Sequence, residues 1–370
     1  MKTNLFVRLL LPFVFICVSA GILSAVIRKP HAEKKATPEI VLSGGTTLRE
    51  ISEKYGFERP VLKKTLGLRD KRDLDKSLAE LGIPARQAEM RLRKAAAFQA
   101  EESSKDWRKI LSKFPLWLVF LAAAFVRLRA GRVTPRARFA LLAAAVLVFG
   151  VLFGPDPSPM GTVKDAIVLF GRERVIFPPR LIALGIFLIS VVLANKFICA
   201  WGCQFGTLQE LIFRLNRDAS DKHGLVRQIK VPFAVSNGVR IVFFAAFTVA
   251  AFVWSTDIVK PIDPFGIFNP RALGAAGAVF IAALLVASIF IYRPWCHFFC
   301  PFGLVGWLFE KISVNHVKVD YGKCIACESC AKACPTNVMN AILKQNGTVP
   351  DCFSCGTCMN VCPVGAVSLD

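Results

Sequence analysis

The chain has 370 residues, of which 54% are hydrophobic, and its mean hydropathy is +0.49. It carries 47 Lys and Arg residues against 26 Asp and Glu residues, which gives a net charge of +21. This composition excludes an ordinary soluble domain and favours a membrane protein with no nucleic-acid partner, because the basic residues cluster in short loops between apolar segments.

Six apolar segments are candidates for membrane-spanning helices, each of which needs about 20 mostly apolar residues. They are Leu5–Ile27, Phe114–Val126, Phe139–Gly154, Leu181–Phe197, Ile241–Trp254 and Ala272–Tyr292. The second is short and requires its flanking basic side chains to reach back to the membrane surface. The first is an anchor or a cleaved signal, and the orientation of the remaining chain is the same in either case.

The basic residues of the short loops predict the orientation in the membrane. The loop Arg127–Arg138 holds five Arg and no acidic residue, so it should be cytoplasmic. Alternation then places residues 28–113 outside the cytoplasm and the C-terminus inside it. We therefore expect a multi-pass protein of the bacterial inner (cytoplasmic) membrane.

Residues 28–113 are expected to form a small extracytoplasmic helical domain. Within it, "TTLREISEKYGFERPVLKKTLGL" is echoed by "DLDKSLAELGIPARQAEMRLRKA", and in each an apolar helical pattern breaks at a Gly. A helix-turn-helix DNA reader is one interpretation. The predicted location outside the cytoplasm favours a docking or spacer module instead.

The stretch Ser43–Thr47 is similar to the S-G-A-T motif at which FMN is attached covalently in some membrane proteins. Gly45 replaces the Ala, and too little chain surrounds the motif for a flavin domain. The alternative is a Ser/Thr N-cap that opens a helix at Leu48. We expect this alternative, and no FMN.

Two C-x3-C motifs follow predicted spans, with Cys199 and Cys203 in the first and Cys296 and Cys300 in the second. Each has a basic residue three positions before its first cysteine and a Phe-Gly pair after its second, at a constant offset of 97 residues. Residues 139–312 therefore predict a tandem repeat of a two-span unit. A parallel repeat brings equivalent points together, here at the cytoplasmic surface. If helical, each pair presents both thiols on one face. Four thiolates would be enough for one more cluster or metal ion. The alternative is four buried, unligated thiols.

The C-terminal tail carries two C-x2-C-x2-C-x3-C-P runs, which is the spacing of two [4Fe–4S] clusters. The fourth cysteine of each run serves the other cluster. The first cluster then takes Cys324, Cys327, Cys330 and Cys362, and the second takes Cys352, Cys355, Cys358 and Cys334. Structural zinc is the alternative, although zinc sites usually offer two C-x2-C pairs per metal.

Two C-x3-C motifs at span ends, followed by a two-cluster ferredoxin, resemble the NapH-type membrane ferredoxins, and NosR-type and CcoG-type proteins are similar. The resemblance covers about residues 139–370. It implies quinol oxidation or transmembrane electron transfer that serves a periplasmic reductase. In the family both motifs usually end in Pro, whereas here the first has Gln204. Paired membrane histidines and a C-x-x-C-H motif are absent from the sequence, so neither b-type nor c-type haem attachment is expected.

The predicted fold is a membrane all-α protein of about six transmembrane helices with a C-terminal α+β ferredoxin domain. The expected domains are an anchor or signal at 1–27, the extracytoplasmic domain at 28–113, a helix and basic loop at 114–138, the repeats at 139–235 and 236–319, and the ferredoxin at 320–370.

The predicted function is electron transfer between a quinol or cytoplasmic donor and an extracytoplasmic reductase or cytochrome. A quinol dehydrogenase subunit is one form of it. The alternatives are a copper reductase or metallocentre assembly factor of the CcoG kind, and a non-enzymatic redox-sensing scaffold.

Overall fold

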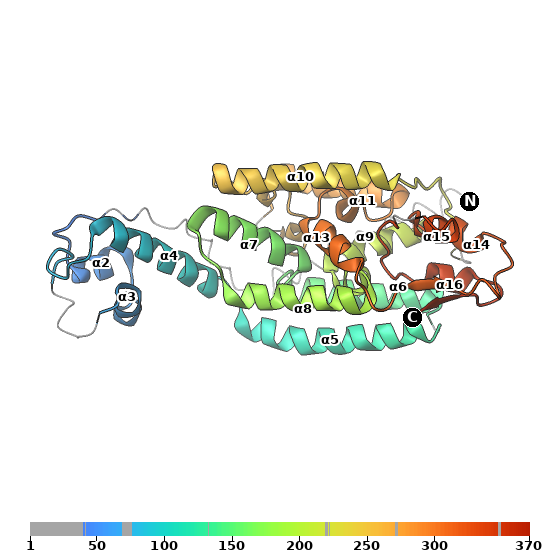
Figure 1. The fold of residues 1–370 in the computed structure, drawn as a ribbon, viewed down its shortest axis with the longest axis horizontal. Helices are drawn as coiled ribbons and strands as arrows, with labels where there is room; N and C mark the ends of the chain where they lie inside the picture. Colours follow the sequence, from blue (N-terminus) through green and yellow to red (C-terminus); the bar gives the residue numbers. More distant parts are fainter. Residues whose placement is uncertain are drawn as a thin grey trace.

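The computed structural model describes residues 40, 42–68, 76–131, 133–218, 221, 223–270, 273–346 and 349–370. The predicted span Leu5–Ile27 lies outside these residues. The described chain is elongated (Figure 1), with a small helical unit at one end, a cysteine-rich unit at the other and long helices running between them. The two ends are therefore separated by the length of the membrane helices.

The small helical unit contains α2 (Leu48–Tyr55), α3 (Arg59–Leu66) and the long α4 (Ala85–Ser103). Thr47 and Glu50 form a capping box at the start of α2. Ser77 and Glu80 exchange the same two hydrogen bonds, at 3.1 and 3.3 Å. Thr47 and Ser77 are joined by an antiparallel bridge, so the two copies of the sequence echo pair through their cap residues.

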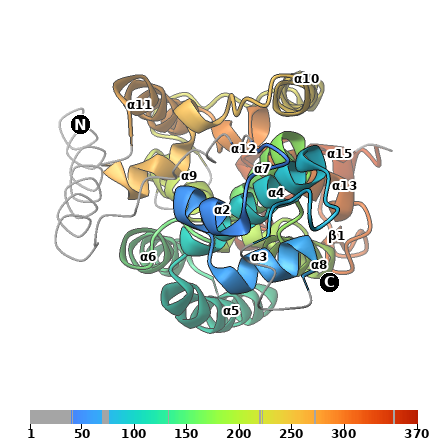
Figure 2. The ribbon, with the colours of Figure 1, turned by 90° about the vertical axis from the view of Figure 1, so that its left-hand side faces the viewer.

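Five of the six predicted spans fall on apolar helices of the described chain. They are α5 (Trp107–Arg129), α6 (Pro135–Ala145) continuing through η2 (Val146–Leu152), α8 (Pro178–Ala194), α10 (Phe233–Val253) and α11 (Ala275–Phe290). By length and composition three can cross a membrane: α5, the α6–η2 helix and α10; α8 and α11 are shorter. Viewed from the end (Figure 2), α5, α6, α10 and α11 lie on the outside of the bundle.

Helix α5 runs through residue 113, where the extracytoplasmic domain was expected to end. Lys113 is buried inside this helix and does not lie at a water-exposed helix start. Its side chain is 2% exposed and its ammonium donates to the carbonyls of Gly154 and Asp156, at 2.6 and 3.0 Å. These carbonyls replace the water that a Lys would otherwise need. The polar start of the helix therefore extends the short apolar segment to a full span.

The loop between the α6–η2 helix and α8 holds the helix α7 (Pro159–Glu173). α7 packs against α8, α10 and α13 (Pro301–Glu310) inside the bundle. Gly171 permits this contact, because a Cβ there would lie 2.6 Å from the Ala251 carbonyl oxygen of α10. The loop between α10 and α11 holds two short 3₁₀ turns, η4 (Lys260–Ile262) and η5 (Pro264–Phe268).

The cysteine-rich unit is closed by a two-stranded antiparallel sheet. β1 (Val317–Val319) pairs with β2 (Val367–Leu369), with Val317 opposite Leu369. Between the strands lie α14 (Ser329–Ala333), α15 (Val338–Leu343) and α16 (Thr357–Val361). Because β1 begins before residue 320 and β2 ends the chain, the sheet fastens both ends of the unit together.

Candidate metal centres

The eight cysteines of the tail line two separate cavities. One, of about 370 Å³ including its opening, is lined by Cys324, Cys327, Cys330 and Cys362. The other, of about 380 Å³, is lined by Cys334, Cys352, Cys355 and Cys358. The fourth cysteine of each run thus lies at the cavity of the other run, as the sequence predicts for two clusters.

The backbone repeats the same turn in both runs. Ala326 and Ser354, each two residues after the first cysteine, have φ of 54° and 47°. Glu328 and Gly356, each one residue after the second cysteine, have φ of 58° and 75°. These left-handed residues turn the chain around each cavity, and Glu328 and Gly356 lead into α14 and α16 respectively.

The short helices α14 and α16 pack against each other and distribute the third and fourth cysteines. Cys330 lies within α14 and Cys334 follows its end, while Cys358 lies within α16 and Cys362 follows its end. The third cysteine therefore stays with its own run. The fourth points across to the other, which explains the crossed arrangement.

The two cavities differ in exposure. Cys327 of the first is exposed to solvent. The second is lined by Tyr292 of the membrane unit and by Phe353, and Cys358 is buried. The first cavity thus faces outward and the second faces the bundle.

A buried ion-pair cluster docks the tail on the bundle. Asp351 binds Lys196 at 2.6 Å and Arg240 at 2.7 Å, and all three side chains are at most 1% exposed. Burial disfavours the ionised carboxyl, but Lys196 and Arg240 outweigh it and lower the pKa of Asp351 to about 2. Asp351 therefore remains charged at neutral pH.

The two C-x3-C motifs lie in short irregular turns. Cys199 is in η3 (Ile198–Gly202) and Cys203 ends that turn, before α9 (Gln204–Leu215). Cys296 is in α12 (Pro294–Phe298), and Cys300 is the N-cap of α13. The expectation that each pair shares one face of a regular helix is therefore not met, because the chain leaves the helix before the second cysteine.

All four of these thiols are buried, and they are neighbours: a thiolate at Cys199 would be opposed electrostatically by Cys203, Cys296 and Cys300. Among the residues that the structure describes, no three His, Cys, Asp or Glu side chains are close enough to share one metal ion. That result covers the tail cavities too. A cubane cluster spans more space than one ion, so this spacing argues against a single-ion site and not against a cluster.

The aligned basic residues of the two motifs cross over to the opposite motif. Arg293 donates to the carbonyls of Cys199 and Ala200, the latter at 2.9 Å. Lys196 donates to the Gly303 carbonyl at 2.7 Å. Each motif is therefore held in place by the cation that precedes the other, which accounts for the basic residue found in both.

The glycine of each Phe-Gly pair is required for steric reasons. A Cβ on Gly206 would lie 2.7 Å from the Cys199 carbonyl oxygen, and a Cβ on Gly303 would lie 2.7 Å from that of Cys296. Real Cβ atoms do not approach so closely. Only glycine lets the new helix pass the carbonyl of the first cysteine.

Sequence reasoning missed Arg240 and Trp117, and it identified Gln204 only as the residue that replaces the usual Pro. Arg240 donates to the carbonyls of Cys296 and Gly303, at 3.4 and 3.2 Å. The Trp117 indole N–H donates to the Gly202 carbonyl at 3.1 Å. Gln204 is buried, and its amide oxygen and nitrogen have no hydrogen-bond partner. A basic residue inside an apolar span was the available signal for Arg240.

Comparison with known families matches two kinds of iron–sulfur domain. The family described as 4Fe-4S dicluster domain matches residues 316–364, and the one described as 4Fe-4S binding domain matches twice, at 175–222 and 273–319. Over 45% of its length the chain is 29% identical to YccM, a candidate electron transport protein of Escherichia coli (strain K12), and the match covers 49% of YccM. Over 60% of its length it is 30% identical to Protein NirI of Paracoccus denitrificans (strain Pd 1222), and the match covers 35% of NirI.

These matches confirm the resemblance to NapH-type membrane 4Fe–4S electron-transfer proteins. The protein carries iron–sulfur domains, and its apolar helices fit a membrane protein. The chain spans half or less of the length of these two relatives. The matched domains begin at residue 175, so the small helical unit and α5 to α7 lie outside them. No solved structure matches the chain.

Proposed function

We propose that this protein carries electrons across the bacterial inner membrane, between a quinol or cytoplasmic donor and an extracytoplasmic reductase or cytochrome. The observation that supports it is the pair of four-cysteine cavities, one facing outward and one facing the bundle. Bound [4Fe–4S] clusters supply reversible one-electron chemistry. The protein holds their thiolates and fixes their place relative to the membrane.

The residues of the tail fit two such clusters. Cys324, Cys327, Cys330 and Cys362 would hold one, and Cys334, Cys352, Cys355 and Cys358 would hold the other. Each cavity is lined by four thiols and mostly apolar side chains, and the described lining of the second includes no acidic residue. Thiolate sets of this kind suit iron–sulfur clusters, since the protein need supply no other ligand.

We also propose that Cys199, Cys203, Cys296 and Cys300 form one shared site for a third cluster, since their spacing among the described residues does not suit the single metal ion that the sequence also allowed. The four thiols are buried neighbours, and Arg293, Lys196 and Arg240 bring three buried cations to their loops. Four thiolates repel one another, and these cations already pair with Glu210 and Asp351, so a bound cluster is what would compensate the thiolates. The shared site would follow from a tandem two-span repeat, with the motifs related across a parallel pseudo-twofold axis.

The proposed orientation places the tail in the cytoplasm and the small helical unit outside it. This agrees with the five Arg in Arg127–Arg138 and with the position of the two units at opposite ends of the molecule (Figure 1). Reporter fusions at Gly131, Gly161 and Asp370 should read inside, outside and inside. A cytoplasmic signal at Gly161 would contradict the orientation and the extracytoplasmic partner.

The test of cluster binding uses the full chain, purified anaerobically. We expect iron and acid-labile sulfide in equal amounts, and EPR signals of reduced [4Fe–4S] clusters. Cys362→Ser should damage the cluster assigned to Cys324, Cys327 and Cys330 and leave the other largely intact. Zinc without sulfide would contradict the proposal. Damage confined to the other cluster would contradict the crossed ligand sets.

A further inference from the structure

The two tail cavities differ in the charges that surround them. The described lining of the first cavity contains one acid, Glu328, and no basic residue. Lys332, the cation whose charge acts on Cys327, is exposed to water, so its field is screened. The second cavity instead lies against buried arginines of the membrane bundle. A cluster in each cavity would therefore meet a different electrostatic environment.

A threonine hydroxyl joins two of these arginines to the second cavity. A thiolate at Cys355 would act electrostatically on Arg138 of α6 and on Arg214 of α9. Both arginines donate to the Thr357 hydroxyl, at 3.2 and 3.0 Å. The Thr357 oxygen also lies 3.5 Å from the Cys355 sulfur and 3.4 Å from an Asp221 carboxylate oxygen. A thiolate that binds a cluster has no proton, so the hydroxyl is the donor in its contact with that sulfur.

The arginines at this junction outnumber the buried acids. Four of them share two carboxylates, and all six side chains are at most 6% exposed. They are Arg138, Arg214, Arg217 and Arg293, with Asp221 and Glu210. One further buried acid, Glu310, accepts from the Cys352 N–H at 2.7 Å. Among the described residues, four buried cations therefore stand against three buried acids beside the second cavity.

Arg138 also has two nitrogens with unused donors. Its side chain is fully buried, and one terminal nitrogen pairs with Asp221 and Thr357. Its Nε and its other terminal nitrogen have no hydrogen-bond partner. This second terminal nitrogen would lie 3.4 Å from a Cβ on Gly356, which lines the cavity. A buried cationic donor without an acceptor is costly, so the arrangement is short of a negative charge beside the second cavity.

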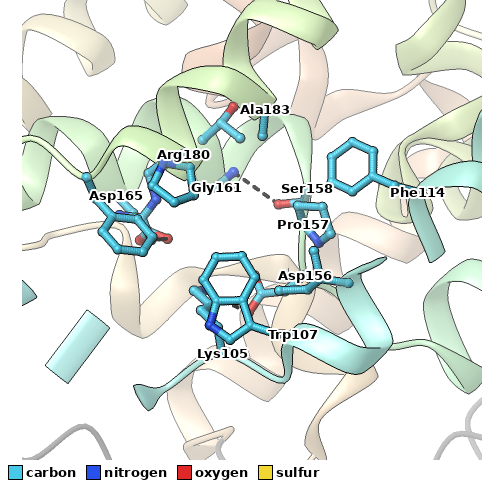
Figure 3. Close-up of a pocket in the computed structure, with 14 residues that line it drawn as sticks. Lys105, Trp107, Phe114, Asp156, Pro157, Ser158, Gly161, Asp165, Arg180 and Ala183 are labelled. Atoms are coloured by element: carbon cyan, nitrogen blue, oxygen red, sulfur yellow. Dashed lines mark hydrogen bonds and ion pairs between the residues drawn. The ribbon is translucent and has the colours of Figure 1, made fainter. Parts of the chain in front are cut away.

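At the end of the bundle next to the small helical unit, by contrast, the cations that line a pocket are matched by acids. This pocket, of about 490 Å³ including its open mouth, lies between the α4–α5 junction and the starts of α7 and α8 (Figure 3). Lys105 pairs with Glu101 and Asp156, at 3.6 and 3.1 Å. Arg180 pairs with the same Glu101 and with Asp165. The excess of buried cations is therefore a feature of the junction with the tail.

We propose that Arg138, together with the arginines that share Asp221, raises the reduction potential of the cluster in the second cavity above that of the first. Reduction adds a negative charge, which burial alone would oppose. Buried cations and a hydrogen bond to a ligand sulfur favour the reduced form. The inference rests on the proposed function, because it requires a cluster in each cavity.

This order of potentials sets a direction for electron flow. One electron leaves the exposed first site and one arrives at the second, next to the bundle, with no proton transferred. The donor of the proposed function then replaces the electron at the first site. Because the first cavity faces outward at Cys327, the direction selects the cytoplasmic donor of the two that the proposed function allows.

The test is a potentiometric titration followed by EPR, on the full chain purified anaerobically. Cys327→Ser and Cys355→Ser each disturb one tail cluster and so assign the two midpoint potentials. We expect the second midpoint to lie above the first. Arg138→Gln should weaken reduction of the second cluster about tenfold, a downward shift of about 59 mV in that midpoint alone, since it removes one charged donor. Arg138→Lys keeps the charge and should restore most of the shift.

Arg136→Gln is the matched control, because Arg136 is exposed on the same helix and should affect neither midpoint. A second midpoint that lies below the first, or one that Arg138→Gln leaves unchanged, would overturn the inference. If Arg138→Gln does not fold, Thr357→Val decides, since it removes the hydroxyl beside Cys355 and should lower the same midpoint. Protein without iron and sulfide contradicts the proposed function, whereas protein with both tail clusters and unshifted potentials contradicts this inference alone.

Discussion

The two C-x3-C motifs share their geometry but differ in what compensates their cations. Arg293, which holds the first motif, pairs with Glu210 of α9 at 2.6 Å. Lys196, which holds the second motif, pairs with Asp351 of the tail at 2.6 Å. The cation that holds the first motif is thus compensated within the membrane bundle, whereas the cation that holds the second is compensated only when the tail is docked.

The two motifs also differ at the residue that follows the second cysteine. Pro301 opens α13 in the second motif, at the first helical position, where proline is favoured. Gln204 opens α9 in the first, and its buried amide has no partner. The two motifs therefore differ at the first helical position, and they share the cation and the glycine.

The largest expected effect tests whether the motifs act together. Cys199→Ser and Cys296→Ser, one from each motif, should each remove the same metal and about a third of the bound iron if three [4Fe–4S] clusters are present. Iron, sulfide and EPR of the full chain measure this, with Cys17→Ser as the control, because Cys17 is the one cysteine of the sequence outside the two motifs and the two tail runs. Unchanged metal content in both variants would show that the four thiols hold no shared site.

The next effect concerns the counter-ions. Asp351→Asn leaves Lys196 and Arg240 buried without their carboxylate, so we expect a loss of about 3–5 kcal/mol and release of the tail. Limited proteolysis between residues 310 and 320 should detect the release. Glu210→Gln should lower the thermal midpoint without releasing the tail.

Asp370→Asn is the matched control, because Asp370 forms only an exposed pair with Arg129, worth less than about 1 kcal/mol. Equal proteolysis of the Asp351 and Glu210 variants would break the contrast between the motifs.

A smaller effect, of equal size in the two motifs, is expected when their glycines are replaced. Gly206→Ala and Gly303→Ala should each cost about 1–3 kcal/mol, because the added methyl group meets a cysteine carbonyl in both motifs. Gly185→Ala, on α8, has no atom within 4 Å of the new Cβ and should be neutral or slightly stabilising. Thermal midpoints of the three variants give the comparison. A neutral result at either motif glycine would contradict the close approach.

The smallest effect is expected for Gln204→Pro, which gives the first motif the residue of the second. It removes a buried amide without a partner and places proline at the first helical position, so we expect a gain of about 1 kcal/mol. The thermal midpoint and the metal content should both be retained or improved. A loss of metal would show that Gln204 has a role that proline cannot fill.

Local spacing predicted much of this arrangement. Each C-x2-C-x2-C-x3-C run predicted the three cysteines that line its own cavity, because a few residues of backbone fix them, and the fourth from the other run followed from the pattern of two-cluster ferredoxins. The apolar segments predicted five helices, since burial in lipid requires long apolar stretches. The aligned Lys196 and Arg293 marked positions that both contact the opposite motif.

Long-range contacts were not predictable in this way. α7 carries charged residues between apolar ones, and its packing against α8, α10 and α13 explains its position inside the bundle. Arg240 reaches the Cys296 carbonyl across 56 residues, and no periodic pattern records such a contact. The pocket beside Arg180 joins segments that lie far apart in the sequence, so it is visible only once the helices are assembled.

The docking of the tail has a further consequence. Besides the Asp351 cluster, Trp201 donates to the Ser354 carbonyl, Arg217 to that of Ala333 and Lys230 to that of Ala331. A domain held at so many separate points cannot swing on a tether between distant partners. If the tail holds clusters as proposed, they stay at fixed positions relative to the bundle, and a soluble redox partner would have to approach the exposed loop at Cys327.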